Sequence, residues 1–171
     1  MPGAISDSST LIHLAKIGRL DLLREFHKKI FIAPAVWKEV VQEGREWPGS
    51  TEVDLGRQAG WIEVVDPANR PLINLLQKDL HKGESETIAL AVQLTADVVF
   101  LDESEARRTA RVYGLNITGV IGILIRARRE GRIPSLQEEL DRLRNDAGFC
   151  IGDDVYKKAL HASGEGKERL K

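Results

Sequence analysis

Short apolar runs alternating with helical patterns constrain the fold of this chain most strongly. Five runs of this kind predict strands: residues 4–6, 30–33, 61–65, 97–101 and 115–118. Short apolar runs bounded by polar residues are typical of parallel strands that are buried on both faces. Because helical patterns separate these strands, we expect an α/β fold, a three-layer α/β/α arrangement with a central, mainly parallel sheet.

The helical patterns fill most of the intervening chain. We expect helices over residues 11–15, 20–26, 34–41, 83–94, 103–113, 120–129 and 135–143. Ser8 or Ser9 can cap the first helix, and Ser135 with Glu138 forms a capping-box pattern at the last. The segments Pro48-Gly49 and Asn69-Arg70-Pro71 are typical of loops.

The 171 residues suit one domain, expected over residues 1–150, with a polar C-terminal tail over 151–171 that can be partly helical. The only cysteine is Cys150, which excludes an intramolecular disulfide and fits a reducing cytoplasm. The longest apolar stretch, Gly119–Ile125, is far short of the roughly 20 residues that span a membrane. We also find no signal-peptide pattern, so we expect a cytoplasmic protein without a membrane partner.

Two aspartates follow predicted strands directly. Asp7 ends the first strand, and Asp102 ends the strand over residues 97–101. In a parallel sheet both side chains emerge at the same edge, where two carboxylates repel each other unless a cation lies between them. Hard divalent cations such as Mg²⁺ prefer oxygen ligands of this kind. The pair therefore predicts a metal site.

Three glutamates can complete this site. Glu39 borders the apolar face of the helix after the second strand, and Glu84 and Glu86 begin the helix before Asp102. Each acid also has an ordinary interpretation. Asp7 and Asp102 can be helix caps, and the glutamates can be solvated or helix-dipole charges. Only their order along an α/β scaffold favours the metal site.

Four motifs in this order resemble the PIN-domain superfamily over nearly the whole chain. They are Ile5-Ser6-Asp7-Ser8-Ser9-Thr10-Leu11-Ile12, Pro34-Ala35-Val36-Trp37-Lys38-Glu39-Val40, Gly83-Glu84-Ser85-Glu86-Thr87-Ile88-Ala89-Leu90-Ala91 and Phe100-Leu101-Asp102-Glu103. The segment Thr118-Gly119-Val120-Ile121-Gly122-Ile123-Leu124 is similar to one in a prokaryotic branch of predicted nucleic-acid-binding PIN proteins close to the VapC-type toxins.

The resemblance implies a Mg²⁺- or Mn²⁺-dependent ribonuclease with an α/β/α fold, often a homodimeric toxin with a small antitoxin partner. The chain departs from the better-known toxins in two places. It has Glu84 and Glu86 where they have a single Asp, and Leu101 where they have Thr or Ser. Two helical positions lie about 200° apart, so we do not expect both glutamates to bind one ion directly. The sequence leaves the choice between them open.

Our hypothesis is an endoribonuclease that cuts single-stranded RNA. Asp7, Asp102 and one of Glu84 or Glu86 would bind the cation, and Glu39 would position or deprotonate the attacking water. The alternative is a catalytically weak or inactive module that binds nucleic acid or a partner. A phosphatase with an aspartyl nucleophile is disfavoured, because Ser9 replaces the second Asp of the usual Asp-x-Asp pair.

Basic residues are expected to hold the RNA backbone, because the net charge of −1 excludes a generic polyanion binder and requires a local patch. The candidates are Arg107, Arg108, Arg111, Arg126 and Arg129. They can equally serve the dipoles of their helices. Aromatic residues make up 5%, too few for an array that reads a single strand. The four histidines are far apart in sequence, and we expect them to be structural or solvated.

Overall fold

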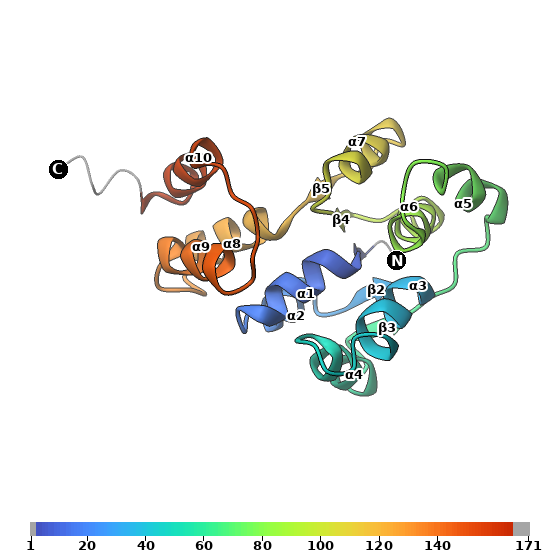
Figure 1. The fold of residues 1–171 in the computed structure, drawn as a ribbon, viewed down its shortest axis with the longest axis horizontal. Helices are drawn as coiled ribbons and strands as arrows, with labels where there is room; N and C mark the ends of the chain where they lie inside the picture. The colour runs from blue at the N-terminus through green and yellow to red at the C-terminus, as the bar shows by residue number, and fades with distance from the viewer. Residues whose placement is uncertain (1–2, 166–171) are drawn as a thin grey trace.

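The computed structural model describes residues 3–165 and contains one parallel sheet of five strands (Figure 1). The strands are β1 (Ala4–Ser6), β2 (Ile30–Ile32), β3 (Ile62–Val64), β4 (Val98–Phe100) and β5 (Ile117–Thr118). Their order across the sheet is β3-β2-β1-β4-β5, and every neighbouring pair is parallel. With helices around it, this sheet confirms the expected three-layer α/β/α fold.

The central strand β1 fixes where a site can form. Ala4, Ile5 and Ser6 are all buried, and β1 pairs with β2 on one side and β4 on the other. Ser6 lies beside Phe100 in the register of β1 and β4. The strand order reverses between these two strands, and α/β sheets place ligands at this kind of switch point. Asp7 and Asp102 therefore leave the sheet at this edge.

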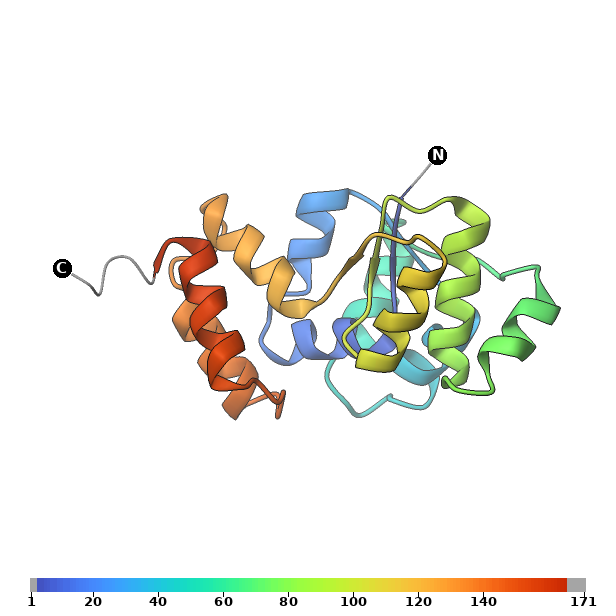
Figure 2. The same ribbon diagram turned by 90° about the horizontal axis from the view of Figure 1, so that it is seen from above.

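Eleven helical segments surround the sheet in the described residues (Figure 2). They are α1 (Ser8–Lys16), α2 (Asp21–His27), α3 (Pro34–Trp37), the π-helix η1 (Lys38–Gln42), α4 (Ser50–Gln58), α5 (Arg70–Leu76), α6 (Lys82–Leu94), α7 (Ser104–Val112), α8 (Val120–Arg129), α9 (Leu136–Asn145) and α10 (Asp153–Ser163). Helix α6 packs on β1 and β4, α2 on β2, and α4 on β3. No helix of the described residues is long and apolar enough to cross a membrane.

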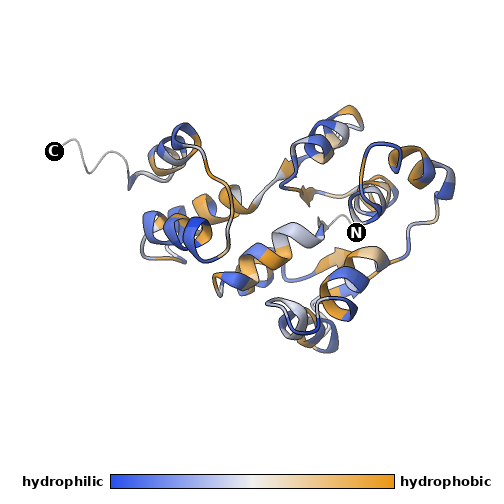
Figure 3. Ribbon diagram, in the orientation of Figure 1, coloured by the Kyte–Doolittle hydropathy of each residue, from blue (hydrophilic) through white to orange (hydrophobic). Residues whose placement is uncertain are grey.

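Apolar residues gather along the strands and on the inward sides of the helices (Figure 3). The last helix, α10, packs on α8 and α9 and buries Ala159 and Leu160. Residues 153–163 are thus the helical part of the polar C-terminal segment. Residues 166–171 of that segment lie outside the described residues.

Two helices were missed, and one loop prediction was wrong. Asn69-Arg70-Pro71 was expected to be a loop, but Arg70 and Pro71 form the first turn of α5. The Asn69 side chain caps this turn by accepting from Leu72 N, and proline is tolerated at a first turn. Helix α4 was not predicted because only Ser50, Val53 and Gly56 of its residues are buried. That is too narrow a stripe to give a clear helical pattern.

Candidate active site

Asp7 is the cap of helix α1 and also a buried acid at the sheet edge. Its Oδ1 accepts a hydrogen bond from Thr10 N at 3.0 Å, so Asp7 is the cap rather than Ser8 or Ser9. The residue is only 2% exposed. An ordinary cap is solvated, whereas this carboxyl group is enclosed. The two interpretations of Asp7 that the sequence left open therefore describe one geometry.

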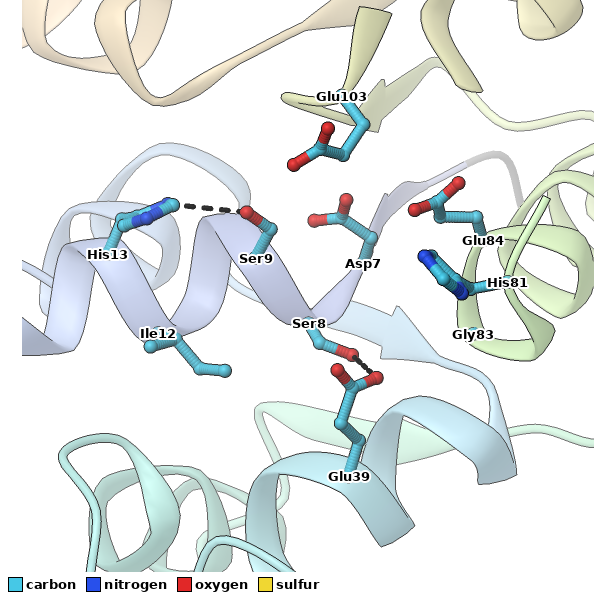
Figure 4. A pocket seen from close by; sticks show the side chains of 10 residues that line it. All are labelled: Asp7, Ser8, Ser9, Ile12, His13, Glu39, His81, Gly83, Glu84 and Glu103. Atoms are coloured by element: carbon cyan, nitrogen blue, oxygen red, sulfur yellow. Dashed lines mark hydrogen bonds between the residues drawn. The ribbon is translucent and has the colours of Figure 1, made fainter. Parts of the chain in front are cut away.

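A cavity of about 370 Å³ opens at this edge of the sheet (Figure 4). Four acidic and two histidine side chains are among its lining residues: Asp7, Glu39, Glu84, Glu103, His13 and His81. Ser8, Ser9, Ile12 and Gly83 complete the lining. No Lys or Arg of the described chain lines it. The acids come from four different segments of the fold, so the cavity is a product of the tertiary structure.

Glu39 is held at the cavity by Ser8. The Ser8 hydroxyl donates to Glu39 Oε2 at 2.7 Å. Glu39 lies in η1, and π-helical turns within helices are frequent at functional sites. A Cβ added at Gly83 would lie 3.2 Å from Glu39 Oε2, so the glycine allows the carboxylate to approach α6 closely. Glu39 therefore faces the cavity despite lying on an exposed helical turn.

Helix α6 separates its two glutamates. Glu84 lines the cavity, with His81 beside it (Figure 4). Glu86 is 2% exposed and accepts a hydrogen bond from Ala35 N at 3.2 Å, in the first turn of α3. First-turn N–H groups have no partner within their own helix, so the Glu86 carboxylate satisfies one of them. Glu86 is thus engaged in joining α6 to α3 and is not among the residues that line the cavity.

Asp102 is not among the residues that line the cavity. Its Oδ2 accepts from the Thr10 hydroxyl at 2.7 Å, and its Oδ1 accepts from Val120 N at 2.9 Å. The second bond ties Asp102 to the start of α8. A Cβ at Gly119 would lie 2.5 Å from Asp102 Oδ1, so only glycine fits there without displacement. Both carboxylate oxygens therefore have protein donors.

Burial and neighbouring acids raise the pKa values of Asp7 and Glu84. Burial, followed by the charges of Asp102 and Glu84, raises the pKa of Asp7 from 3.8 to about 8, although the hydrogen bond from Thr10 N opposes this. Burial also raises the pKa of Glu84, with contributions from Glu103 and Glu39. Removal from water and like charges both disfavour a carboxylate. A cation in the cavity would relieve both effects.

Glu103 and His13 line the cavity, although neither was a predicted site residue. Glu103 is the N-cap of α7 and has an extended backbone. The sequence signal for Glu103 was its place directly after Asp102 at a strand end, but that place alone does not say whether the side chain reaches the site. Ser9 bonds to His13 Nδ1 at 3.3 Å.

The structure does not bring the five predicted RNA-binding arginines to the cavity. Arg107 donates to Leu101 O, and Arg108 pairs with Glu105. Arg126 pairs with Glu130 and lies over Phe26, whereas Arg129 donates to Ala162 O. Arg111 is exposed. Four of the five therefore have structural partners, and a role in RNA binding stays a prediction.

The donor set fits a hard divalent cation that keeps part of its water shell. Within residues 3–165, no three Asp, Glu, His or Cys side chains are gathered tightly enough to hold a metal ion by themselves. Carboxylates from separate elements do surround one cavity, and Asp7 is buried there without a Lys or Arg in the lining. Mg²⁺ is commonly bound through one or two carboxylates and several waters, so this arrangement suits it.

The chain matches a known family model. No curated protein matches the chain. The family model described as PIN domain matches residues 3–165, which is nearly the whole chain and contains every residue of the acidic cavity. PIN domains are generally nucleases, so the match supports the broad class of activity, a hydrolase that acts on nucleic acid. The chain, with its parallel sheet and its acids at the switch point, belongs to the PIN-domain family.

Proposed function

We propose that this chain is a metal-dependent endoribonuclease that cuts single-stranded RNA. The observation that carries the proposal is the cavity at the switch point, which Asp7, Glu39, Glu84 and Glu103 all line, without Lys or Arg in the lining. This concentration of acids would repel a phosphodiester by itself. With a divalent cation the same cavity attracts phosphate.

Asp7 and Glu84 are the proposed direct ligands, and Mg²⁺ or Mn²⁺ is the proposed ion. Both carboxyl groups line the cavity. Burial and neighbouring acids raise the pKa of each. Asp102 would act through water, because both of its oxygens already accept from Thr10 and Val120. Glu86 would keep its contact with Ala35 N and stay out of the ligand set.

Glu39 is the proposed group that orients the attacking water. Ser8 fixes Oε2 of Glu39, which leaves Oε1 to accept a proton from water in the cavity. Thr10 holds Asp102 and Asp7 together, because its hydroxyl donates to one and its N–H to the other. When bound, the cation supplies positive charge for the phosphate and acidifies water. In this proposal the chain's own residues would hold the water, the ion and the phosphate within one cavity.

A cleavage assay tests this function. Purified protein is incubated with mixed single-stranded RNA and Mg²⁺ or Mn²⁺, beside Asp7→Asn and Asp102→Asn. We expect cutting that requires the cation, stops with chelator, and falls at least about 100-fold in Asp7→Asn. Equal cutting by the wild type and both variants would mean a contaminating nuclease and would overturn the assignment.

A binding module with little or no turnover is the second candidate. It is favoured by the absence, within residues 3–165, of a ready-made cluster of three metal-binding side chains, and by the two protein donors on Asp102. Retention of RNA on the wild type without cutting, in the presence of either cation, would select this candidate over the nuclease.

We extend the proposal to a cytoplasmic toxin that forms a homodimer and is neutralised by a small antitoxin. Its support is the similarity of the segment Thr118 to Leu124 to one in a prokaryotic branch of PIN proteins that lies close to the VapC-type toxins. Expression of the chain alone should then arrest growth of a bacterial host, and Asp7→Asn should relieve the arrest. Arrest by both forms alike, or by neither, would argue against a toxin.

A further inference from the structure

Trp47 stands exposed beside the acidic cavity. Its side chain is 69% exposed, in the turn between η1 and α4. Trp61, by contrast, is 7% exposed, and Trp37 lies under the guanidinium of Arg57 at 4.6 Å. Among residues 3–165, no ring or cation contacts the Trp47 indole. Packing of the core therefore does not account for this large apolar side chain.

A second cavity of about 260 Å³ runs along Trp47. Its lining includes Ile12, Lys16, Val40 and Trp47. It shares two residues, Ile12 and Glu39, with the acidic cavity, so the two spaces are neighbours across this pair. Figure 4 shows Ile12 and Glu39 on the same side of the acidic cavity. A nucleic-acid strand that lies in one cavity can therefore continue into the other.

The chemistry of the second cavity suits a nucleotide. An exposed indole offers a face on which any base can stack, and Ile12 and Val40 add apolar surface. Lys16 forms no ion pair within residues 3–165, so its ammonium group is available to a phosphate. Glu43 also lines this cavity, and its Oε1 lies 4.0 Å from Lys38 Nζ, which offsets its charge.

We propose that Trp47 and Lys16 form a nucleotide subsite next to the acidic cavity, which holds one unpaired base by stacking and one phosphate of the strand. The inference deepens the proposed function, because it explains why a single strand would be the substrate. In a duplex the bases stack on each other and cannot reach the indole. One aromatic side chain holds one base without reading a sequence, in keeping with the absence of an aromatic array.

Tryptophan fluorescence tests the subsite without relying on cleavage. The probe is a short single-stranded oligoadenylate, titrated into full-length Asp7→Asn protein so that no cutting intervenes. We expect quenching that is absent when Trp47→Phe is added, while the affinity stays within about twofold because phenylalanine still stacks. Trp47→Ala should weaken binding about tenfold, the size expected for loss of one stacked base. Leu55→Ala, at a similarly exposed position on α4, should leave binding unchanged.

Salt dependence tests Lys16 separately. The slope of log affinity against log salt should fall by about 0.7 in Lys16→Gln, the value for one phosphate contact on a single strand. Lys158→Gln, on exposed α10, is the matched control and should keep the wild-type slope. The same oligonucleotide as a duplex should quench little.

The outcomes separate this inference from the proposed function. Quenching with no cutting by the wild type would retain the subsite and reject the nuclease. Cutting with an unchanged KM in Trp47→Ala, and no quenching, would retain the nuclease and overturn the subsite. A shift of molecular mass in Trp47→Ala with unchanged RNA binding would assign Trp47 to a protein interface and would also overturn it.

Discussion

Thr10 and Asp7 show how single residues set the character of the site. Thr10 is fully buried, donates its hydroxyl to Asp102 and donates its N–H to Asp7. One threonine therefore aligns two acids from different strands. Asp7 stays buried because its cap bond holds it inside the edge of the sheet rather than in solvent. Burial of the Asp7 carboxyl group disfavours its ionised form.

Asp7→Asn should be more stable than the wild type at alkaline pH, and the difference should grow as the pH rises. Folding raises the pKa of Asp7 from 3.8 to about 8, so the folded state binds the proton more tightly than the unfolded state. Its contribution to stability is then present at low pH and is lost as pH rises from about 4 to about 8. Asparagine keeps the acceptor for Thr10 N without the charge. At pH 8, without a divalent cation, we expect a free energy of unfolding higher by about 2 to 4 kcal/mol.

Urea unfolding at several pH values measures this difference. Asp79→Asn, at an exposed aspartate, is the control and should leave the pH profile parallel to that of the wild type. A gap between Asp7→Asn and the wild type that stays constant from acid to mild alkali would show that Asp7 is not the titrating group.

Thr10→Val should reduce cleavage while preserving the helix. Valine has the shape of threonine and keeps the N–H bond to Asp7, but it removes the donor to Asp102 Oδ2. Loss of partners that orient metal-site ligands typically costs about 10- to 100-fold in activity or metal affinity. The measurement is kcat on single-stranded RNA. Thr109→Val removes a hydroxyl bonded to Glu105 O in α7, away from the cavity, and should leave kcat unchanged.

At the scale of elements, α6 shows why sequence alone could not finish the site. The spacing of Glu84 and Glu86 excluded joint ligation, but it could not say which of them faces the cavity. That choice depends on where α3 packs, because Ala35 N in α3 donates a hydrogen bond to the Glu86 carboxylate. The parallel sheet and the order of the acids were predictable, because strand periodicity and strand ends are local properties. Glu103, Ser8 and His81 were not predictable as neighbours, because distant segments bring them together.

The two glutamates of α6 should respond differently to substitution. Glu84→Gln should abolish cutting and leave stability within about 0.5 kcal/mol, because Glu84 is a partly exposed cavity residue. Glu86→Ala should lower the free energy of unfolding by about 1 to 3 kcal/mol, because it removes a buried side chain and leaves the part-buried Ala35 N–H without its acceptor. Activity and thermal denaturation measured on both variants check this. A third variant, Glu86→Gln, removes the charge of Glu86 but keeps an acceptor for Ala35 N. Loss of cutting in Glu86→Gln, with Glu84→Gln fully active, would reverse the assignment.

The start of α8 is a second element that the site depends on. Gly119→Ala places a Cβ 2.5 Å from Asp102 Oδ1 and 2.8 Å from Arg107 Nη1. We expect Asp102 to be displaced, with cutting reduced about tenfold or more and the protein still folded. Gly152→Ala is the comparison, since a Cβ there meets nothing within 4 Å, and it should retain full cutting. Cutting assays on both variants decide whether the position of Asp102 matters.

At the scale of the whole molecule, the parallel sheet gathers acidic side chains at one of its edges. The strand order brings the ends of β1 and β4 together, and η1, α6 and the start of α7 add acids around them. The chain carries a net charge of −1, because 25 Lys and Arg nearly balance 26 Asp and Glu, so the negative charge of the cavity is a local feature. The predicted arginines lie outside the cavity lining and four of the five have partners, so in our proposal a bound cation attracts the phosphate to the cavity.

Direct titration with Mn²⁺ tests the central claim that this acidic cavity is a divalent-cation site. Free and bound Mn²⁺ are distinguished by electron paramagnetic resonance for the wild type, Asp7→Asn, Glu84→Gln and the remote control Glu138→Gln on α9. We predict one saturable site in the wild type and in the control, with affinity at least about tenfold weaker in each of the two cavity variants. Equal Mn²⁺ affinity in all four proteins, or no saturable binding in the wild type, would contradict the account.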